Sequence, residues 1–323
     1  MNTRRLLTLA LLPILVGYSL VNASDLQLVE TDDSIRISQR GKPILEYVKT
    51  AREVPEGLAE HYSRSGYIHP VYSPTGQEIT GDYPLDHAHQ HALFFAWTKA
   101  SFAGKEVDFW NQAKQQAGIE FRGISEVKRG EKRVSFTAKH AFTVGRGDEK
   151  VDAIIELWTV TVYQTPEDHF LFDVQSVQQC AGETPLVLKQ YRYGGMALRG
   201  NAQWLLGKKP AEKNPAGFRF LTSEGKDRLQ GNHTRPNWVA MSGLLNDQPV
   251  SLAVMGSPEN FRAPQTVRLH PNKPYFCFAP MVDGEFTIQP GEKYVSRYRY
   301  IVTSEAANPQ AIDQHWKLYS SQR

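Results

Sequence analysis

The sequence has little cysteine and little net charge. Only Cys180 and Cys277 occur among its 323 residues, too few for a disulfide-built scaffold and without the Cys-x-x-Cys spacing of zinc or redox sites. Whether the two cysteines form one disulfide or stay as buried thiols is left open by their strand-like surroundings. The 37 Lys and Arg against 34 Asp and Glu give a formal charge of only +3. A chain so close to neutral has no broad basic surface, so we expect no nucleic-acid partner.

Several enzyme motifs are also missing from the sequence. Neither Gly-x-Ser-x-Gly nor His-Glu-x-x-His occurs, which removes the sequence support for an α/β-type hydrolase and for a helical zinc protease. Neither Gly-x-Gly-x-x-Gly nor the phosphate-loop lysine motif occurs, which excludes a glycine-rich nucleotide loop.

A long apolar run occurs only at the N-terminus. Arg4 and Arg5 precede an apolar stretch over 6–20, and small residues at Val21 and Ala23 precede Ser24. This pattern predicts a signal peptide over residues 1–23 and a periplasmic or extracellular protein. An uncleaved anchor is the alternative, but the run is shorter than the ~20 residues that a spanning helix needs. We expect no membrane span after cleavage.

Alternating polar and apolar residues dominate the rest of the chain, with turn-forming residues between the short segments. This pattern predicts an all-β fold, a large antiparallel β-sandwich of the supersandwich type with roughly fifteen strands, as one domain over 24–323. The clearest expected strands are 26–29, 34–38, 43–47, 134–138, 153–163, 169–178, 186–193, 238–241, 250–255, 275–280, 285–288 and 294–302.

One helix is expected, at the C-terminus. Asn308 is a suitable cap, Pro309 suits the first helical position, and Ile312, Trp316 and Tyr319 recur along one face. We expect this face to pack against the sandwich. The polar segment 207–232 is expected to be a surface loop or a lid over a binding face.

Three histidines form the densest group of chemically versatile residues. His87, His89 and His91 alternate with small or polar residues after Asp86. In a strand these positions would share one face about 6 to 7 Å apart. Because imidazole serves both as metal ligand and as proton carrier, the segment predicts a metal site, a metal-free acid/base or binding site, or a structural cluster.

Aromatic and cationic residues flank this segment and are typical of a sugar site, where rings stack on C–H faces and polar groups bind hydroxyls. A segment over 189–193 is expected to be a strand with polar groups on one face, followed by Gly194 and Gly195, which allow a bulge or a close backbone approach. The candidate substrate-binding residues are His69, Asp86, Trp97, Trp110, Arg192, Arg199, His233 and Arg262.

A series of motifs resembles the secreted bacterial family called PmoA-like. They include Tyr-Ile-His-Pro-Val-Tyr-Ser-Pro-Thr-Gly over 67–76, Asp-His-Ala-His over 86–89, Asp-Phe-Trp over 108–110 and Gly-Gly-Met-Ala-Leu-Arg over 194–199. In that family the histidine segment more often reads Asp-His-x-His-His, and Gln90 stands in place of a histidine. The resemblance implies a role in bacterial polysaccharide degradation. A membrane oxygenase subunit, which the family name suggests, would need several ~20-residue spans that this chain lacks.

A weaker resemblance, at the level of the fold, is to galactose-mutarotase-like sandwiches. Our leading hypothesis is a carbohydrate-active protein with His87, His89 or His91 as acid/base or ligand. A sugar-binding protein without catalysis is the first alternative, with Trp97, Trp110 and Arg199 as contacts. A metalloenzyme with a single divalent metal at the histidines is the second.

Overall fold

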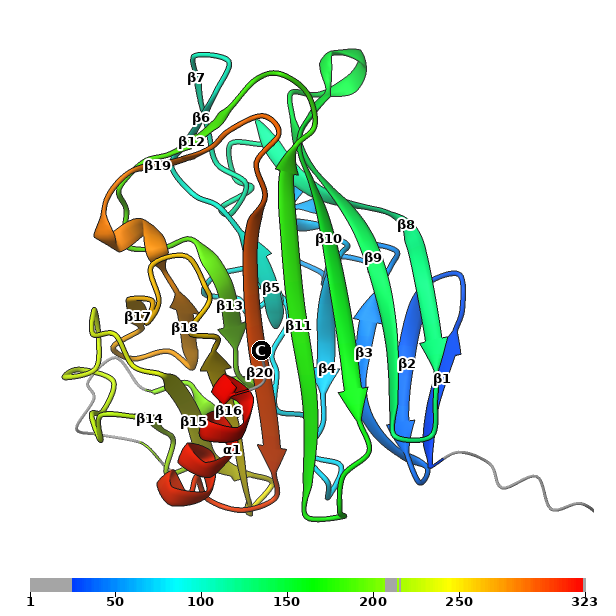
Figure 1. Ribbon diagram of the computed structural model, residues 1–323, viewed down its shortest axis with the longest axis vertical. Coiled ribbons are helices and arrows are strands. Elements are labelled where there is room, and N and C mark those ends of the chain that lie inside the picture. The colour runs from blue at the N-terminus through cyan, green and yellow to red at the C-terminus, as the bar shows by residue number, and fades with distance from the viewer. Residues whose placement is uncertain (1–24, 207–213, 215, 322–323) are drawn as a thin grey trace, which may run out of the picture.

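The computed structural model describes residues 25–206, 214 and 216–321. Two eight-stranded antiparallel sheets form the body of the protein (Figure 1). The first sheet contains, in spatial order, β1 (Leu26–Glu30), β2 (Ser34–Gln39), β3 (Lys42–Val48), β4 (Tyr67–Val71), β5 (Leu93–Ala96), β13 (Gly195–Arg199), β18 (Tyr275–Phe278) and β17 (Val267–Leu269). The second contains β14 (Arg219–Thr222), β15 (Trp238–Leu245), β16 (Gln248–Gly256), β20 (Tyr294–Thr303), β11 (His169–Cys180), β10 (Val151–Tyr163), β9 (Arg133–Val144) and β8 (Ala117–Arg129).

A smaller four-stranded sheet lies at one end of the sandwich, at the top of Figure 1. Its strands are β19 (Phe286–Ile288), β12 (Leu186–Leu188), β6 (Ala100–Phe102) and β7 (Lys105–Val107). Four short 3-10 helices lie in the connections, at Glu60–Tyr62, Gly147–Glu149, Ala202–Trp204 and Pro280–Asp283.

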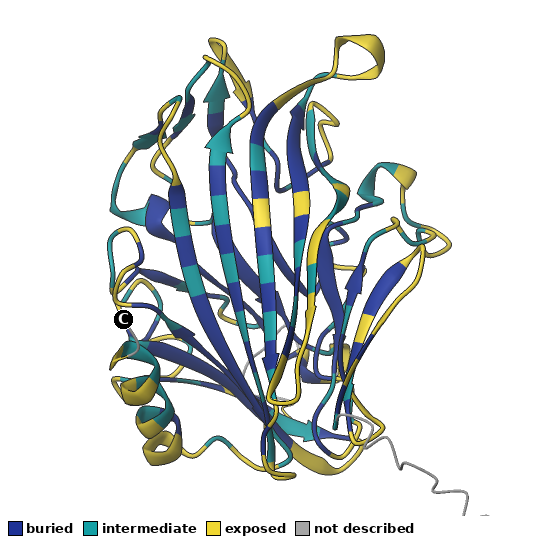
Figure 2. Ribbon diagram, turned by 45° about the vertical axis from the view of Figure 1, so that its right-hand side comes forward, coloured by how far each residue is buried: buried dark blue, intermediate teal, exposed yellow. Residues whose placement is uncertain are grey.

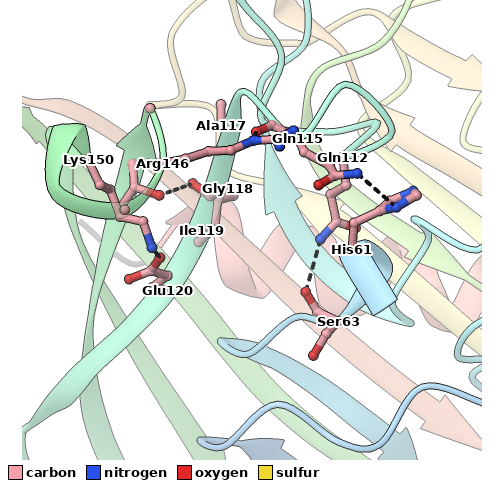
Figure 3. A pocket seen from close by; sticks show the side chains of 13 residues that line it. His61, Ser63, Gln112, Gln115, Ala117, Gly118, Ile119, Glu120, Arg146 and Lys150 are labelled. Carbon is pink, nitrogen blue, oxygen red and sulfur yellow. Dashed lines mark hydrogen bonds and ion pairs between the residues drawn. The ribbon is translucent and has the colours of Figure 1, made fainter. Parts of the chain in front are cut away.

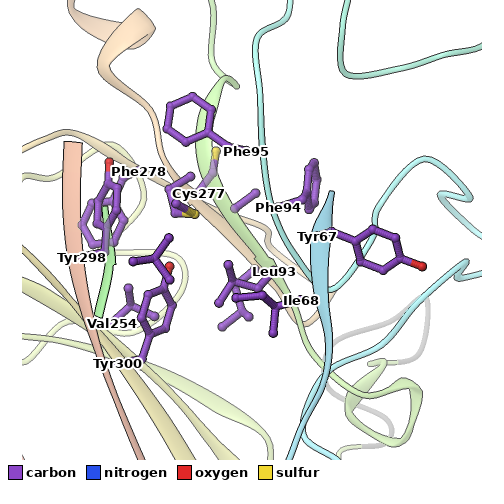
Figure 4. Packing of buried hydrophobic residues seen from close by; sticks show 14 of the residues in the cluster. Tyr67, Ile68, Leu93, Phe94, Phe95, Val254, Cys277, Phe278, Tyr298 and Tyr300 are labelled. Atoms are coloured by element: carbon purple, nitrogen blue, oxygen red, sulfur yellow. The ribbon is translucent and has the colours of Figure 1, made fainter. Parts of the chain in front are cut away.

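The two large sheets enclose one extensive apolar core. Buried and less buried positions alternate along the long strands of the second sheet, as expected when one face is packed and the other is not (Figure 2). Phe278 of the first sheet packs on Tyr298 of the second at a ring-centroid distance of 5.0 Å (Figure 4). Side chains alternate along a strand, so Tyr275, three residues from Phe278 on β18, points away from the core side on which Phe278 lies. Arg199 is the paired neighbour of Tyr275 on β13 and points to the same face as Tyr275.

The C-terminal helix α1 (Pro309–Ser321) forms as expected. The Asn308 side chain accepts a hydrogen bond from the Ala311 amide at 3.1 Å, which caps the first turn. Ile312 is buried, and Trp316 and Tyr319 pack beside it on the outer face of the second sheet. The helix therefore has a packing role.

The all-β sandwich with one C-terminal helix is confirmed, and the local structure differs from expectation in three segments of the chain. Strand β12 ends at Leu188, so 189–193 is irregular. The segment 207–232 is not loop throughout, because it contains β14. The long strand β8 was missed, since Gly118 and Gly123 and two register shifts interrupt its alternation.

Cys180 and Cys277 are free thiols. Among the described residues, no helix is long and apolar enough to cross a membrane. The predicted signal peptide, 1–23, lies outside the described residues, and so does the 207–213 part of the polar segment.

Candidate functional site

The histidine segment is a pair of turns and not a strand, which corrects the first expectation about it. The His87 amide donates to the Pro84 carbonyl and the Gln90 amide donates to the His87 carbonyl, each at 2.9 Å. Only His91 forms a β-bridge, with Asp82. Pro84 has no amide proton to donate to a strand ladder, which favours the turn. The three imidazoles therefore do not share one strand face.

The turns bring two of the histidines next to residues that are distant in sequence. We name this group the open cluster, because most of its members are partly exposed to solvent. It contains Asp86, His87 and His89 from the turns, Arg199 from the end of β13, and His270 and Lys273 from the connection between β17 and β18.

Asp86 is the electrostatic centre of the open cluster. Its carboxylate accepts from Arg199 Nη2 at 2.9 Å and from Lys273 Nζ at 2.7 Å. Gln90 also accepts from the Arg199 guanidinium, at 2.8 Å. Partial burial alone would raise the pKa of Asp86, but its contacts with His87 and Lys273 and the charge of Arg199 hold it well below its usual range. The Asp86 carboxylate thus forms ion pairs with two cations and remains ionised.

His87 has a defined tautomer in this arrangement. Lys273 Nζ lies 2.6 Å from His87 Nδ1, and an ammonium group can only donate. Nδ1 must therefore accept, which places the ring proton on Nε2. The side chain is 34% exposed, so this N–H is a donor available to a ligand.

His89 and His270 are neutral near pH 7. Burial first, and then the positive charges of Lys273 and Arg199 among others, lower the pKa of each to about 3. The rings of His87 and His89 are 5.4 Å apart, and those of His87 and His270 are 6.2 Å apart. Neutral imidazoles can both donate and accept hydrogen bonds.

Aromatic rings continue from the open cluster along the first sheet. Tyr193 packs 6.0 Å from Tyr275, the strand partner of Arg199, and 6.2 Å from Trp110. The guanidinium groups of Arg192 and Arg268 lie 5.4 Å and 5.3 Å from the Tyr193 ring centre. Gly194 and Gly195 let this segment approach the sheet, because a Cβ on Gly195 would lie 2.2 Å from the Phe278 carbonyl oxygen.

His91 is separated from the other two histidines by its partners. It is fully buried, with Nδ1 2.9 Å from Asp82 and Nε2 3.3 Å from Gln112. Both ring nitrogens are therefore occupied within the protein. Among the described residues, no group of three His, Cys, Asp or Glu side chains is placed to hold a metal ion. The histidines thus do not form the three-ligand set that the metal hypothesis requires.

The two candidate tryptophans are buried. Trp97 is completely buried and donates from its indole nitrogen to Gln178 at 2.7 Å. Trp110 is 3% exposed and packs on Phe94. Neither ring is a free stacking surface, whereas Tyr193, which packs on the strand partner of Arg199, is half-buried.

Of the remaining candidates, two have structural contacts only and one lies near the site. His69 is buried against Thr80 and Glu78, and burial lowers its pKa to about 4. Arg262 donates to the carbonyl oxygens of Pro280 and Gly284 and holds a turn. His233 lies beside Arg192 and Arg268, whose charges, after burial, lower its pKa. Only His233 borders the site.

Sequence reasoning missed Lys273 and His270. Their segment, Arg268-Leu-His-Pro-Asn-Lys-Pro-Tyr over 268–275, combines a short alternation of polar side chains with two prolines. That composition is the one indication that could have drawn attention to it.

A second polar group lies inside the sandwich, and we name it the buried network. Tyr47 Oη contacts His140 Nε2 at 2.5 Å, and His140 Nδ1 contacts Glu156 at 2.9 Å. The same carboxylate accepts from Gln178, which accepts from Trp97. All of these side chains are almost completely buried. The network joins the two large sheets and has no contact with solvent.

A polar cavity of about 290 Å³ lies between the first 3-10 helix and β8 (Figure 3). Its charged groups are already satisfied by the protein. Lys150 pairs with Glu120 at 2.6 Å, and Arg146 donates to the carbonyl oxygens of Lys114 and Gln115. His61 also lines the cavity, and its buried Nε2 has no hydrogen-bond partner in the protein. We favour the open cluster because three imidazoles converge there beside an ion-paired carboxylate.

The model of a family described as "Family of unknown function (DUF6807)" matches residues 34–317. The chain belongs to the DUF6807 family. This match is to DUF6807 and not to a family under the name PmoA-like. No curated protein matches the chain.

Solved structures are similar to this DUF6807 protein at low identity. A mutant of the heparan sulfate lyase HepC from Pedobacter heparinus aligns at 9% identity and a TM-score of 0.39, covering 89% of this chain and 36% of the lyase. The chain thus spans about a third of the length of that enzyme. A GalM/aldose epimerase homologue from C. elegans aligns at 10% identity and a TM-score of 0.37, covering 88% of this chain and 100% of the homologue.

Proposed function

We propose that the protein binds a carbohydrate at the open cluster and acts on it through His87 and His89. The observation that supports this most is the convergence of His87 and His89 with His270, from a separate segment, beside an ion-paired carboxylate. Sugar hydroxyls both donate and accept, and a site for them combines such groups with an aromatic ring. Here His87 offers an N–H, His89 is neutral, and the Tyr193 ring lies nearby.

The division of roles follows from the contacts. His87 is held by Lys273 with its proton on Nε2, so it is the group that can donate toward a substrate oxygen. His89 is the neutral partner that can accept a hydrogen bond from a sugar hydroxyl. Asp86 and Arg199 are positioning residues, because their charges are used on each other and on Lys273. The motif resemblance to proteins of polysaccharide degradation points to the same class of ligand.

The experiment is a panel of oligosaccharides assayed for both product formation and calorimetric binding. For an enzyme, H87Q should lower turnover by ~10²-fold or more and leave affinity within a few-fold, because proton transfer acts in the transition state. H61Q is the matched control, since His61 lines the cavity of Figure 3.

Two other results would have clear meanings. Binding without product, weakened by Y193A by ~1 to 3 kcal/mol, would show a sugar-binding protein without catalysis. Binding or turnover lost in H61Q and unchanged in H87Q would contradict the open cluster as the site.

A further inference from the structure

Two positively charged side chains lie on the same tyrosine ring without a negative partner. Arg192 and Arg268 flank Tyr193, each with its guanidinium carbon less than 5.5 Å from the ring centre. Within the described part of the chain, neither forms an ion pair with a carboxylate. Two like charges held near one another raise the free energy of the folded protein unless an anion balances them.

The nearby carboxylates are used elsewhere. Asp283 pairs with Arg235 at 2.8 Å and accepts from Thr266. Asp86 is shared between Arg199 and Lys273. This side of the first sheet therefore carries four cationic side chains, and the one carboxylate within the open cluster is already in contact with two of them.

Arg268 also has an unused donor. Its Nη1 donates to Asn232 and to the Leu269 carbonyl, which fixes the guanidinium in place. Its Nε is buried and has no hydrogen-bond partner in the protein. A buried N–H without a partner is costly. Arg192, by contrast, is exposed and rests only on the rings of Tyr191 and Tyr193.

We infer that Arg192 and Arg268 form a subsite for an anionic substituent of the carbohydrate, a carboxylate or a sulfate. The inference rests on the proposed function and adds the substrate class, an acidic sugar. His270 connects the two regions, because it lies close enough to Arg268, Lys273 and Arg199 for all three charges to affect it. A sugar at the open cluster would thus have its acidic group directed toward Tyr193.

The test compares matched acidic and neutral ligands by titration calorimetry. Galacturonate oligosaccharides are compared with their methyl esters, and sulfated galactose oligosaccharides with the unsulfated ones. The two pairs distinguish carboxylate from sulfate. We expect at least one acidic ligand to bind about tenfold or more tightly than its neutral counterpart, the effect of one charge-assisted hydrogen bond. The preference should shrink as salt rises.

Variants assign the preference to the two arginines. R192Q and R268Q should each remove most of it. R192Q involves an exposed side chain, so it keeps the test valid if R268Q fails to fold. R219Q is the matched control, an exposed arginine on β14 of the other sheet. Its preference should equal that of the wild type.

Each outcome has a definite consequence. Equal affinity for acidic and neutral ligands, or a preference that survives both substitutions, would overturn the acidic subsite and leave the proposed sugar site standing. No binding of any ligand in both pairs would overturn the sugar site and the acidic subsite together.

Discussion

The buried network and the open cluster both place a histidine beside a carboxylate, in opposite settings. In the buried network, His140 has a partner on each ring nitrogen and no exposure to solvent. In the open cluster, His87 is held on one nitrogen only and is 34% exposed on its side chain. A structural histidine is therefore distinguished from a functional candidate by the hydrogen-bond partners of its ring nitrogens and by its solvent exposure, and not by the number of histidines nearby.

The largest difference between the two groups should be in stability. H140A leaves Glu156 and Tyr47 buried without their partner, so we expect a loss of about 3–5 kcal/mol in the free energy of unfolding. H87A removes a partly exposed side chain and should cost less than about 1 kcal/mol. Urea denaturation of the two variants measures both. Equal losses of unfolding free energy in the two variants would contradict the distinction between the buried network and the open cluster.

A smaller effect is expected in the pH dependence of the free energy of unfolding, and it comes from His89 in the open cluster. The pKa of His89 is about 3 in the folded protein and near 6.5 in the unfolded chain. As the pH falls from 7 to 5, the unfolded state takes up the proton first, so the free energy of unfolding falls, by at most about 1–2 kcal/mol for this residue.

The matched variant is H89N, compared with the wild type by urea denaturation at pH 7 and pH 5. Above pH 6.5 His89 is mostly neutral in both the folded and the unfolded state, so its low pKa does not reduce the free energy of unfolding there. The variant should therefore lose less stability than the wild type between the two pH values. The same loss in both proteins would mean that His89 is not held neutral.

The architecture was predictable from the sequence, because alternation of polar and apolar residues reports directly on strands that are buried on one face. The helix was predictable from Asn308, Pro309 and the stripe at Ile312, Trp316 and Tyr319. Strand β8 was not, since glycines and register shifts interrupt its alternation.

Four of the six residues of the open cluster were predictable from their chemistry. Asp86, His87, His89 and Arg199 were recognisable as chemically versatile residues, and the structure brings them together. Lys273 and His270 join them only through the packing of β18 on β13, a long-range contact. The sequence also could not show that Trp97 faces Gln178 in the core. Which residues meet across sheets is a property of the fold.

The most direct test of carbohydrate binding at the open cluster is a carbohydrate titration followed by NMR on protein with ¹⁵N-labelled histidine. The chain has 10 histidines. Three lie in the open cluster, one in the buried network and one at the cavity of Figure 3. The ring signals of His87, His89 and His270 should shift with added ligand, and those of His140 should stay fixed. Shifts confined to His61, or to none of the ten, would contradict it.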